Sequence, residues 1–100
     1  MAKLVWSEEA YHDLDDITDF ILKGSPRYAQ IVGEAIILAS EQALESPYLG
    51  RVVPELKNEN LREKIVYSYR LIYRVSEESI LVVAILHGAR HLMPIIETRL

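Results

Sequence analysis

The 100-residue chain contains no cysteine, which excludes both a disulfide framework and every thiolate zinc site. Glycine and proline are scarce, at four residues each, so collagen-like and low-complexity chains are excluded as well. The longest apolar run, from Ile80 to Leu86, has seven residues, whereas a membrane span needs about 20. Glu8 and Glu9 stand where a signal peptide would need its apolar stretch. We therefore expect a cytoplasmic protein that does not span a membrane.

The remaining composition is that of one globular domain over residues 1–100, because half of the residues are hydrophobic and 26% are charged. The charge is distributed unevenly. Residues 1–50 hold three Lys or Arg against nine acids, whereas residues 51–100 hold eight against six. Proteins that bind phosphate non-specifically are usually basic overall, but the net charge here is −4. Any contact with nucleic acid is therefore expected only in the second half.

The first half predicts a short strand followed by a helical hairpin. An extended segment from Lys3 to Trp6 precedes Ser7, which is a suitable N-cap for a helix. Apolar residues then repeat at helical spacing until Gly24, where the helix is expected to stop. A second helix is predicted to begin at Ser25-Pro26 and to end at Ser46-Pro47, since proline is well tolerated in the first helical turn.

The second half changes to the two-residue period of β-strands. Residues 48–60 predict an ordered loop, with a short strand near Val52-Val53. Three segments rich in Val, Ile, Leu and Tyr follow, from Leu61 to Val66, Tyr69 to Val75 and Ser79 to His87. The predicted fold class is therefore α+β: an N-terminal strand, a helical hairpin and a three-stranded antiparallel meander.

Basic residues recur along the predicted meander. Arg70 and Arg74 share one strand face with Ile72, because strand side chains alternate. We expect Arg62 and Lys64 to extend this face from the preceding strand. Three further basic residues lie at or just after the end of the last strand: His87, Arg90 and His91. The pattern predicts an exposed, concave basic surface, and the alternative is a solvated sheet face that arginines merely decorate.

Standard catalytic and metal-binding motifs are not found in the sequence. His87 and His91 are four residues apart, which suits a metal only on a helix and with a third ligand, so no metal site is expected. Neighbouring carboxylates on the first helix point in different directions and do not form an acid/base pair. No Ser-His-Asp arrangement, glycine-rich phosphate loop or metalloprotease motif is present. We therefore expect no cofactor.

A series of short motifs, in order and spacing, resembles the RelE/ParE superfamily of bacterial toxins from about residue 4 to residue 92. The motifs are Trp6-Ser7, Ala10, Asp13-Leu14, Ile17, Phe20-Ile21, Leu44, Pro47, Gly50-Arg51, Pro54-Glu55, Leu61-Arg62-Glu63, Tyr69 to Val75, and His87 to Arg90. The fold of that superfamily is similar to the one predicted above. The resemblance implies the toxin of a type II toxin–antitoxin module, neutralised by a cognate antitoxin whose flexible segment wraps the toxin. Operator DNA would be bound mainly through the antitoxin.

The superfamily contains two kinds of activity, and RelE-like members cleave messenger RNA in the ribosome. In those nucleases strand arginines and lysines stabilise the phosphate, and a C-terminal tyrosine or histidine handles protons. Arg70 and Arg90 match two of the electrostatic positions. The tyrosine would fall near Ile96, so His91 or His87 would have to replace it. A RelE-like reading therefore predicts Arg70, Arg90 and His91 as catalytic residues.

ParE-like members instead act on DNA gyrase. The net charge of −4 and the missing tyrosine favour this reading, and motifs such as Gly50-Arg51 also resemble ParE. The chain is then predicted to be a plasmid-stabilisation toxin that inhibits gyrase without being an enzyme. Its predicted target-binding residues are Arg62, Lys64, Arg70, Arg74, His87 and Arg90. The RelE-like ribonuclease and an inactive relative that acts only as an interaction module remain the alternatives, so enzymatic activity stays open.

Overall fold

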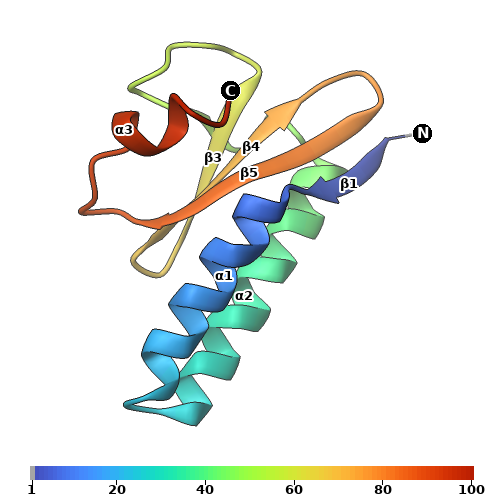
Figure 1. Cartoon of the computed structure of the whole chain (residues 1–100). Helices are drawn as coiled ribbons and strands as arrows, with labels where there is room; N and C mark the ends of the chain where they lie inside the picture. Colours follow the sequence, from blue (N-terminus) through green and yellow to red (C-terminus); the bar gives the residue numbers. More distant parts are fainter. Residues whose placement is uncertain (1) are drawn as a thin grey trace.

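The structure is a computed structural model that describes residues 2–100, and Met1 lies outside the described residues. Eight regular elements follow one another along the chain, and Figure 1 shows how they are arranged. They are β1 (Lys3–Trp6), α1 (Glu8–Leu22), α2 (Pro26–Glu45), β2 (Arg51–Val52), β3 (Leu61–Val66), β4 (Tyr69–Val75), β5 (Ser79–His87) and α3 (Met93–Ile96). The predicted strand, helical hairpin and three-stranded meander are confirmed. The short strand β2 lies one residue earlier than predicted, and α3 was not predicted.

The five strands form one mixed sheet in the order β1-β5-β4-β3-β2. The meander β3-β4-β5 is antiparallel, whereas β1 runs parallel to β5 and places Trp6 opposite Val82. Strand β2 pairs with only two residues of β3. The register between β4 and β5 shifts next to Ile72, so Val83 has no directly opposed residue, which is the geometry of a β-bulge. The predicted α+β class is therefore confirmed.

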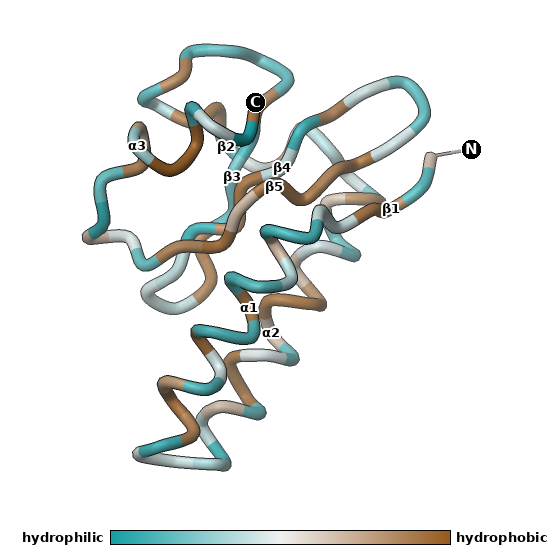
Figure 2. The backbone as a smooth tube through the Cα atoms, viewed as in Figure 1, coloured by the Kyte–Doolittle hydropathy of each residue, from teal (hydrophilic) through white to brown (hydrophobic). Residues whose placement is uncertain are grey.

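The hairpin α1–α2 covers one face of the sheet (Figure 1). Both helices begin at a serine whose hydroxyl accepts a backbone N–H: Ser7 accepts from Ala10 at 3.0 Å, and Ser25 from Tyr28 at 3.1 Å. Figure 2 shows teal and brown alternating along both helices, as expected for amphipathic helices with one buried side. The main buried cluster on this face consists of Ala10, Val32, Ile36, Ala39, Leu71, Val82 and Ile85.

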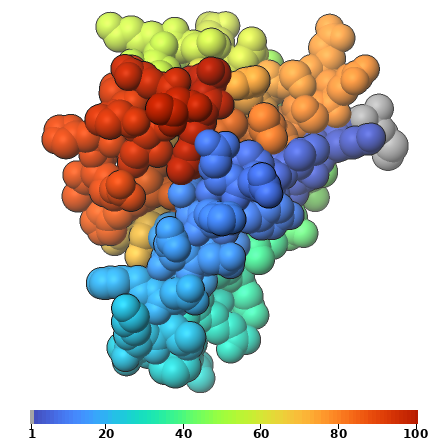
Figure 3. All heavy atoms as spheres, viewed as in Figure 1, coloured from blue at the N-terminus to red at the C-terminus, as the bar shows by residue number. Residues whose placement is uncertain are grey.

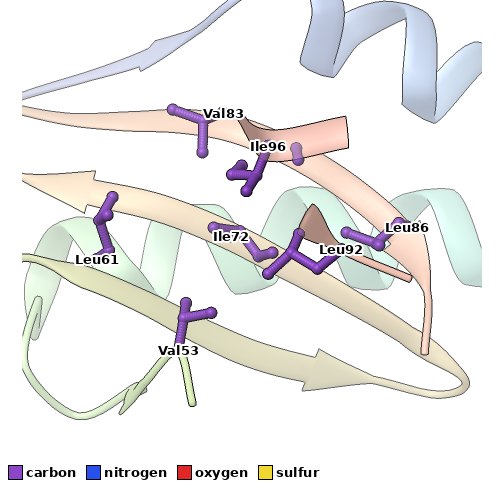
Figure 4. Packing of buried hydrophobic residues seen from close by; sticks show 8 residues of the cluster. Val53, Leu61, Ile72, Val83, Leu86, Leu92 and Ile96 are labelled. Carbon is purple, nitrogen blue, oxygen red and sulfur yellow. The ribbon is translucent and has the colours of Figure 1, made fainter. Parts of the chain in front are cut away.

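The opposite face of the sheet is covered by α3 and by the segment after β2. A second buried cluster lies there, and Figure 4 shows its side chains converging between α3 and the strands. Its members are Val53, Leu61, Ile72, Val83, Ala84, Leu86, Leu92 and Ile96. Strands β4 and β5 are therefore buried on both faces, which differs from the half-exposed meander that the alternation predicted.

The C-terminal segment is fixed to α1 by one ion pair. The Arg99 guanidinium donates to both Asp13 carboxylate oxygens, at 2.6 and 3.1 Å, and also to the Val83 carbonyl at 3.1 Å. The same carboxylate accepts the Ile85 N–H at 3.0 Å. Figure 3 shows the red C-terminal segment directly against the blue α1. Within residues 2–100, no helix is long and apolar enough to cross a membrane.

Candidate target-binding surface

Arg62 and Lys64 do not share a face with Arg70 and Arg74, so that prediction is wrong. Arg62 lies opposite Tyr73, and Lys64 lies opposite Leu71. Directly opposed residues project from the same side of a sheet, and Leu71 belongs to the cluster beneath the hairpin. Glu63 and Ile65 lie opposite Ile72 and Arg70 instead, so the residues between them, Arg62 and Lys64, project from the other face.

On the hairpin side, Arg62 and Lys64 are engaged in contacts within the protein. Arg62 Nε donates to the Glu59 carbonyl at 2.7 Å, and its Nη1 donates to the Gly50 carbonyl at 3.1 Å. Its guanidinium also lies 4.8 Å from the centre of the Tyr48 ring. Lys64 Nζ donates to the Gln42 side chain on α2 at 2.8 Å. These two residues therefore hold the loop before β3 and the end of α2 in place.

The same loop closes over Tyr73. The Tyr73 hydroxyl donates to the Pro47 carbonyl at 2.7 Å, and burial raises the pKa of this phenol. Gly50 passes so close that a Cβ there would lie 2.4 Å from the Tyr73 oxygen. Only glycine therefore fits without a shift of the loop, which explains the Gly50-Arg51 motif physically.

Arg70 is buried, so the expectation that it lies on an exposed surface is wrong. Its residue surface is only 7% exposed. Two of its nitrogens donate to the Glu55 carboxylate, at 2.7 and 2.8 Å, and Nε donates to Glu63 at 2.7 Å. Glu63 in turn accepts from Arg51 Nε on the neighbouring strand β2. The four side chains form a continuous ionic chain, Arg51–Glu63–Arg70–Glu55, which we call the ionic chain below.

The electrostatics of the ionic chain favour the charged forms of Glu55 and Arg70. Hydrogen bonds from Arg70 lower the pKa of Glu55 to about 2, although partial burial opposes this shift. The same bonds raise the pKa of Arg70, with Glu55 as the largest cause and Glu63 as a further one. The Glu63 side chain is fully buried between two arginines. A phosphate could reach Arg70 only by displacing these carboxylates.

Of the basic residues predicted for the site, the exposed ones lie at the end of β5 and in the turn that follows it. His87, Arg90 and His91 are all exposed. The His87 ring contacts Tyr69 edge-on, with the ring centres 5.6 Å apart, and His87 Nδ1 accepts the Ala89 N–H at 3.1 Å. The Arg90 N–H donates to the His87 carbonyl at 3.0 Å, which holds the turn together. Arg74 is half-buried at the opposite end of β4, about 15–20 Å away by strand geometry.

Metal binding and the RelE-like proton site receive no support from this geometry. Residues 88–91 are not helical, so His87 and His91 lack the spacing that a shared metal would require. In the described part of the chain, no group of three or more His, Cys, Asp or Glu could hold a metal ion. Ile96, where the tyrosine of RelE-like members would fall, is completely buried in the α3 cluster.

The structure also has a groove alongside α1 that was not predicted from the sequence. A hollow of about 360 Å³ lies between α1 and the adjoining ends of β4 and β5, and a second of about 650 Å³ continues toward the hairpin tip. Phe20, Tyr69 and His87 line both hollows. One residue could have indicated the groove from the sequence: Phe20 is an aromatic residue that lies outside the apolar stripe of α1. In the structure Phe20 is 74% exposed.

Comparison with known proteins identifies the family of this chain. A curated relative, "Toxin RelE2" of Caulobacter vibrioides, is 35% identical over 91 residues that cover 90% of this chain and 99% of the relative. A solved structure described as "Chromosomal ParDE TA system from P. aeruginosa" matches with a TM-score of 0.71 and 21% identity, over 87% of this chain and 96% of that one. Residues 4–92 match the family model "ParE toxin of type II toxin-antitoxin system, parDE". The chain therefore belongs to the ParE toxin family of type II toxin–antitoxin systems.

Proposed function

We propose that this toxin inhibits DNA gyrase and is not a ribonuclease. Membership of the family implies a cognate antitoxin, and the proposal concerns the target that the toxin reaches when the antitoxin is absent. The observation that carries it is the state of Arg70. A ribonuclease that matches the RelE pattern would use this arginine to stabilise a phosphate. Here two carboxylates already occupy the guanidinium.

The position of Ile96 supports the same conclusion. A general acid or base must be within hydrogen-bond reach of the proton that it transfers. Ile96 has no titratable group and lies in the core, where a tyrosine could not be introduced without overpacking. A tyrosine introduced at this position would therefore disturb the core, which favours the gyrase proposal.

Target contact is proposed through the exposed basic residues. His87 is the last residue of β5 and Arg90 lies in the turn after it, whereas Arg74 is half-buried at the other end of β4. Arg62, Lys64 and Arg70 satisfy their charges or hydrogen bonds inside the protein, so their proposed role in target binding becomes one of holding the scaffold. Mutation of these three would affect activity through the fold.

The second candidate is the ribosome-dependent messenger-RNA endonuclease. It is favoured by the name of one relative, "Toxin RelE2", and by the exposure of Arg90 and His91, two of the three residues predicted as catalytic under that reading. His91 would then handle protons in place of the missing tyrosine.

Induced expression in a bacterial host separates the two candidates. DNA and protein synthesis are labelled in parallel during the first minutes after induction. We expect DNA synthesis to fail first, together with induction of the DNA-damage response. Purified toxin should also block supercoiling by gyrase, and Arg90→Ala should weaken this block at least fivefold. Arg27→Ala, which removes an exposed arginine at the start of α2, is the control with the same change of charge.

Protein synthesis that fails first, with cleaved messenger RNA in the ribosome, would overturn the gyrase proposal in favour of the endonuclease. Growth without arrest would instead indicate the interaction module. Equal losses for Arg27→Ala and Arg90→Ala would contradict the assignment of Arg90 to the target-binding surface.

A further inference from the structure

We propose that His87 acts as a positioning residue: its ring holds the turn that presents Arg90 to the target. The inference deepens the proposed function and rests on it for the role of Arg90 in target contact. Arg90 is also one of the residues predicted as catalytic under the RelE-like alternative, so the same turn serves either target.

The turn after β5 is held by three hydrogen bonds. The Gly88 N–H donates to the Ser68 carbonyl at 2.8 Å, and the Arg90 N–H donates to the His87 carbonyl at 3.0 Å. These two bonds join backbone to backbone and do not involve the side chain at position 87. The Ala89 N–H donates instead to His87 Nδ1, at 3.1 Å. One of the three bonds therefore depends on the imidazole ring.

The bond from Ala89 has the pattern of an Asx turn. In such a turn, the side-chain oxygen of Asn or Asp accepts the backbone N–H two residues further along the chain. Imidazole Nδ1 is separated from its Cα by the same number of bonds as Oδ1 of Asn, so His87 takes the place of such a residue. The bond from the Arg90 N–H to the His87 carbonyl spans three residues, as in a β-turn.

The orientation and the protonation of the ring suit an acceptor. A ring nitrogen that accepts a hydrogen bond carries no proton, so the imidazole proton of His87 lies on Nε2. Tyr69 contacts the ring edge-on, with the ring centres 5.6 Å apart, and restricts its rotation. While the bond from Ala89 is made, His87 is neutral and adds no charge to the surface. The full positive charge of this turn is therefore that of Arg90, which is exposed.

Loss of the ring would weaken target binding without removing the contact group. A flexible segment loses conformational freedom when it binds, and this loss reduces the affinity. The Ala89 N–H directly precedes Arg90, so its hydrogen bond fixes the backbone from which the guanidinium projects. His87 therefore contributes to binding through Arg90, and its contribution disappears where Arg90 is absent.

A double-mutant cycle tests this dependence. His87→Ala, Arg90→Ala and the double variant are compared with the wild type for the toxin concentration that halves supercoiling by purified gyrase. His87→Ala should raise this concentration about fivefold, which corresponds to the loss of one hydrogen bond. In the Arg90→Ala background the same change should raise it less than about twofold, because the two residues act as one unit. Equal factors in both backgrounds would mean that His87 contacts the target itself, and would overturn the inference.

Two further substitutions separate the hydrogen bond from the other properties of the ring. His87→Asn places Oδ1 where it can accept the Ala89 N–H, so it should recover most of the loss seen in His87→Ala. His87→Gln is also polar, but its side chain is one carbon longer, and we expect no recovery. His12→Ala, which removes an exposed histidine from α1, is the control. Equal losses in His87→Asn and His87→Gln would contradict the role of the bond.

NMR spectroscopy follows the turn itself and does not depend on the target. We expect the ¹⁵N shifts of the His87 imidazole to show a neutral ring with its proton on Nε2. Exchange of the Ala89 amide proton should accelerate about fivefold in His87→Ala and His87→Gln but not in His87→Asn. Unchanged exchange in His87→Ala, or a proton on Nδ1, would overturn the inference.

Failure of the inference and failure of the proposed function give different results. If the wild type does not block supercoiling, the gyrase proposal fails, and the double-mutant cycle is measured instead on the inducer concentration that arrests growth. If the wild type blocks supercoiling but the losses in His87→Ala and Arg90→Ala are additive, only the positioning role of His87 is overturned.

Discussion

The two faces of the sheet are both buried, but they are covered in different ways. The hairpin face lies under two helices of 15 and 20 residues, which contribute a continuous apolar stripe. The opposite face lies under a four-residue helix and an irregular loop. This second cover is fastened at single points by ion pairs, Arg70 with Glu55 and Arg99 with Asp13.

The comparison shows that arginines on a strand can serve the fold instead of a ligand. The short covering segments contribute three buried side chains to the cluster on this face, Val53, Leu92 and Ile96, and the ion pairs add to these apolar contacts. Glu55 and Glu63 both accept hydrogen bonds from Arg70, so all three of its guanidinium nitrogens are already bonded within the protein. The basic motif in β4 is therefore a structural feature of the second face.

The largest effect is expected from breaking the ionic chain. Arg70→Ala leaves the fully buried Glu63 carboxylate with Arg51 as its remaining partner. Removing one partner of a buried ion pair costs about 3–5 kcal/mol, a large fraction of the stability of a small domain. Arg74→Ala, in the same strand but half-buried, should cost less than about 1 kcal/mol. Urea denaturation followed by circular dichroism measures both free energies of unfolding.

The outcome also bears on function. If Arg70→Ala is as stable as the wild type and still abolishes growth arrest, Arg70 acts on the target directly and its structural assignment is wrong. Reduced stability together with reduced cellular abundance is the expected result.

A second experiment compares the packing on the two faces of the sheet by making the same isoleucine-to-alanine change on each. Ile36 under the hairpin and Ile96 in α3 are both completely buried. Replacing either by alanine should cost about 2–5 kcal/mol, depending on how far the surroundings collapse into the cavity. We expect the loss of stability in Ile36→Ala to lie at the upper end of this range, because the long helices α1 and α2 move less readily into the cavity than the four-residue helix α3 does. A larger loss for Ile96→Ala would reverse the ranking of the two covers.

The smallest effect concerns acid. The pKa of Glu55 is about 2 in the folded chain and near its ordinary value of 4.5 when unfolded, since Arg70 stabilises the carboxylate. The resulting stabilisation is fully present above about pH 4.5 and is lost as the pH falls from 4.5 toward 2. In Glu55→Gln, unfolding midpoints in urea should therefore change less over this interval than in the wild type. The exposed Glu77→Gln serves as the control, and identical pH profiles for both variants would contradict the assignment.

Much of the fold was predictable because its signals are local. Serine caps, helical spacing of apolar residues and the change to a two-residue period gave five elements nearly at their observed bounds. Helix α3 could not be found in this way, because four residues are too few for a period to appear. The burial of β4 on its second face was not predicted for the same reason, since α3 and the loop after β2 show no periodic pattern of apolar residues.

The candidate site was less predictable, although one clue was present. Glu63 lies in phase with Leu61 along β3, so an acidic residue falls on the apolar face of its strand. That phase already indicates a buried carboxylate in need of an arginine, and it also separates Arg62 and Lys64 from this face. The alternation of side chains within one strand does not show which residues of the next strand lie opposite them.

By itself, the sequence determined the order of the elements, the α+β class and the resemblance to toxins, because capping, periodicity and short motifs act over a few residues. The tertiary structure decided which basic residues are free. Pairing register sent Arg62 and Lys64 to the hairpin face, and distant carboxylates enclosed Arg70. Only the packing of α1 against the end of β5 placed Phe20 beside His87 and Arg90. Such proximities depend on contacts between distant segments, which no local pattern encodes.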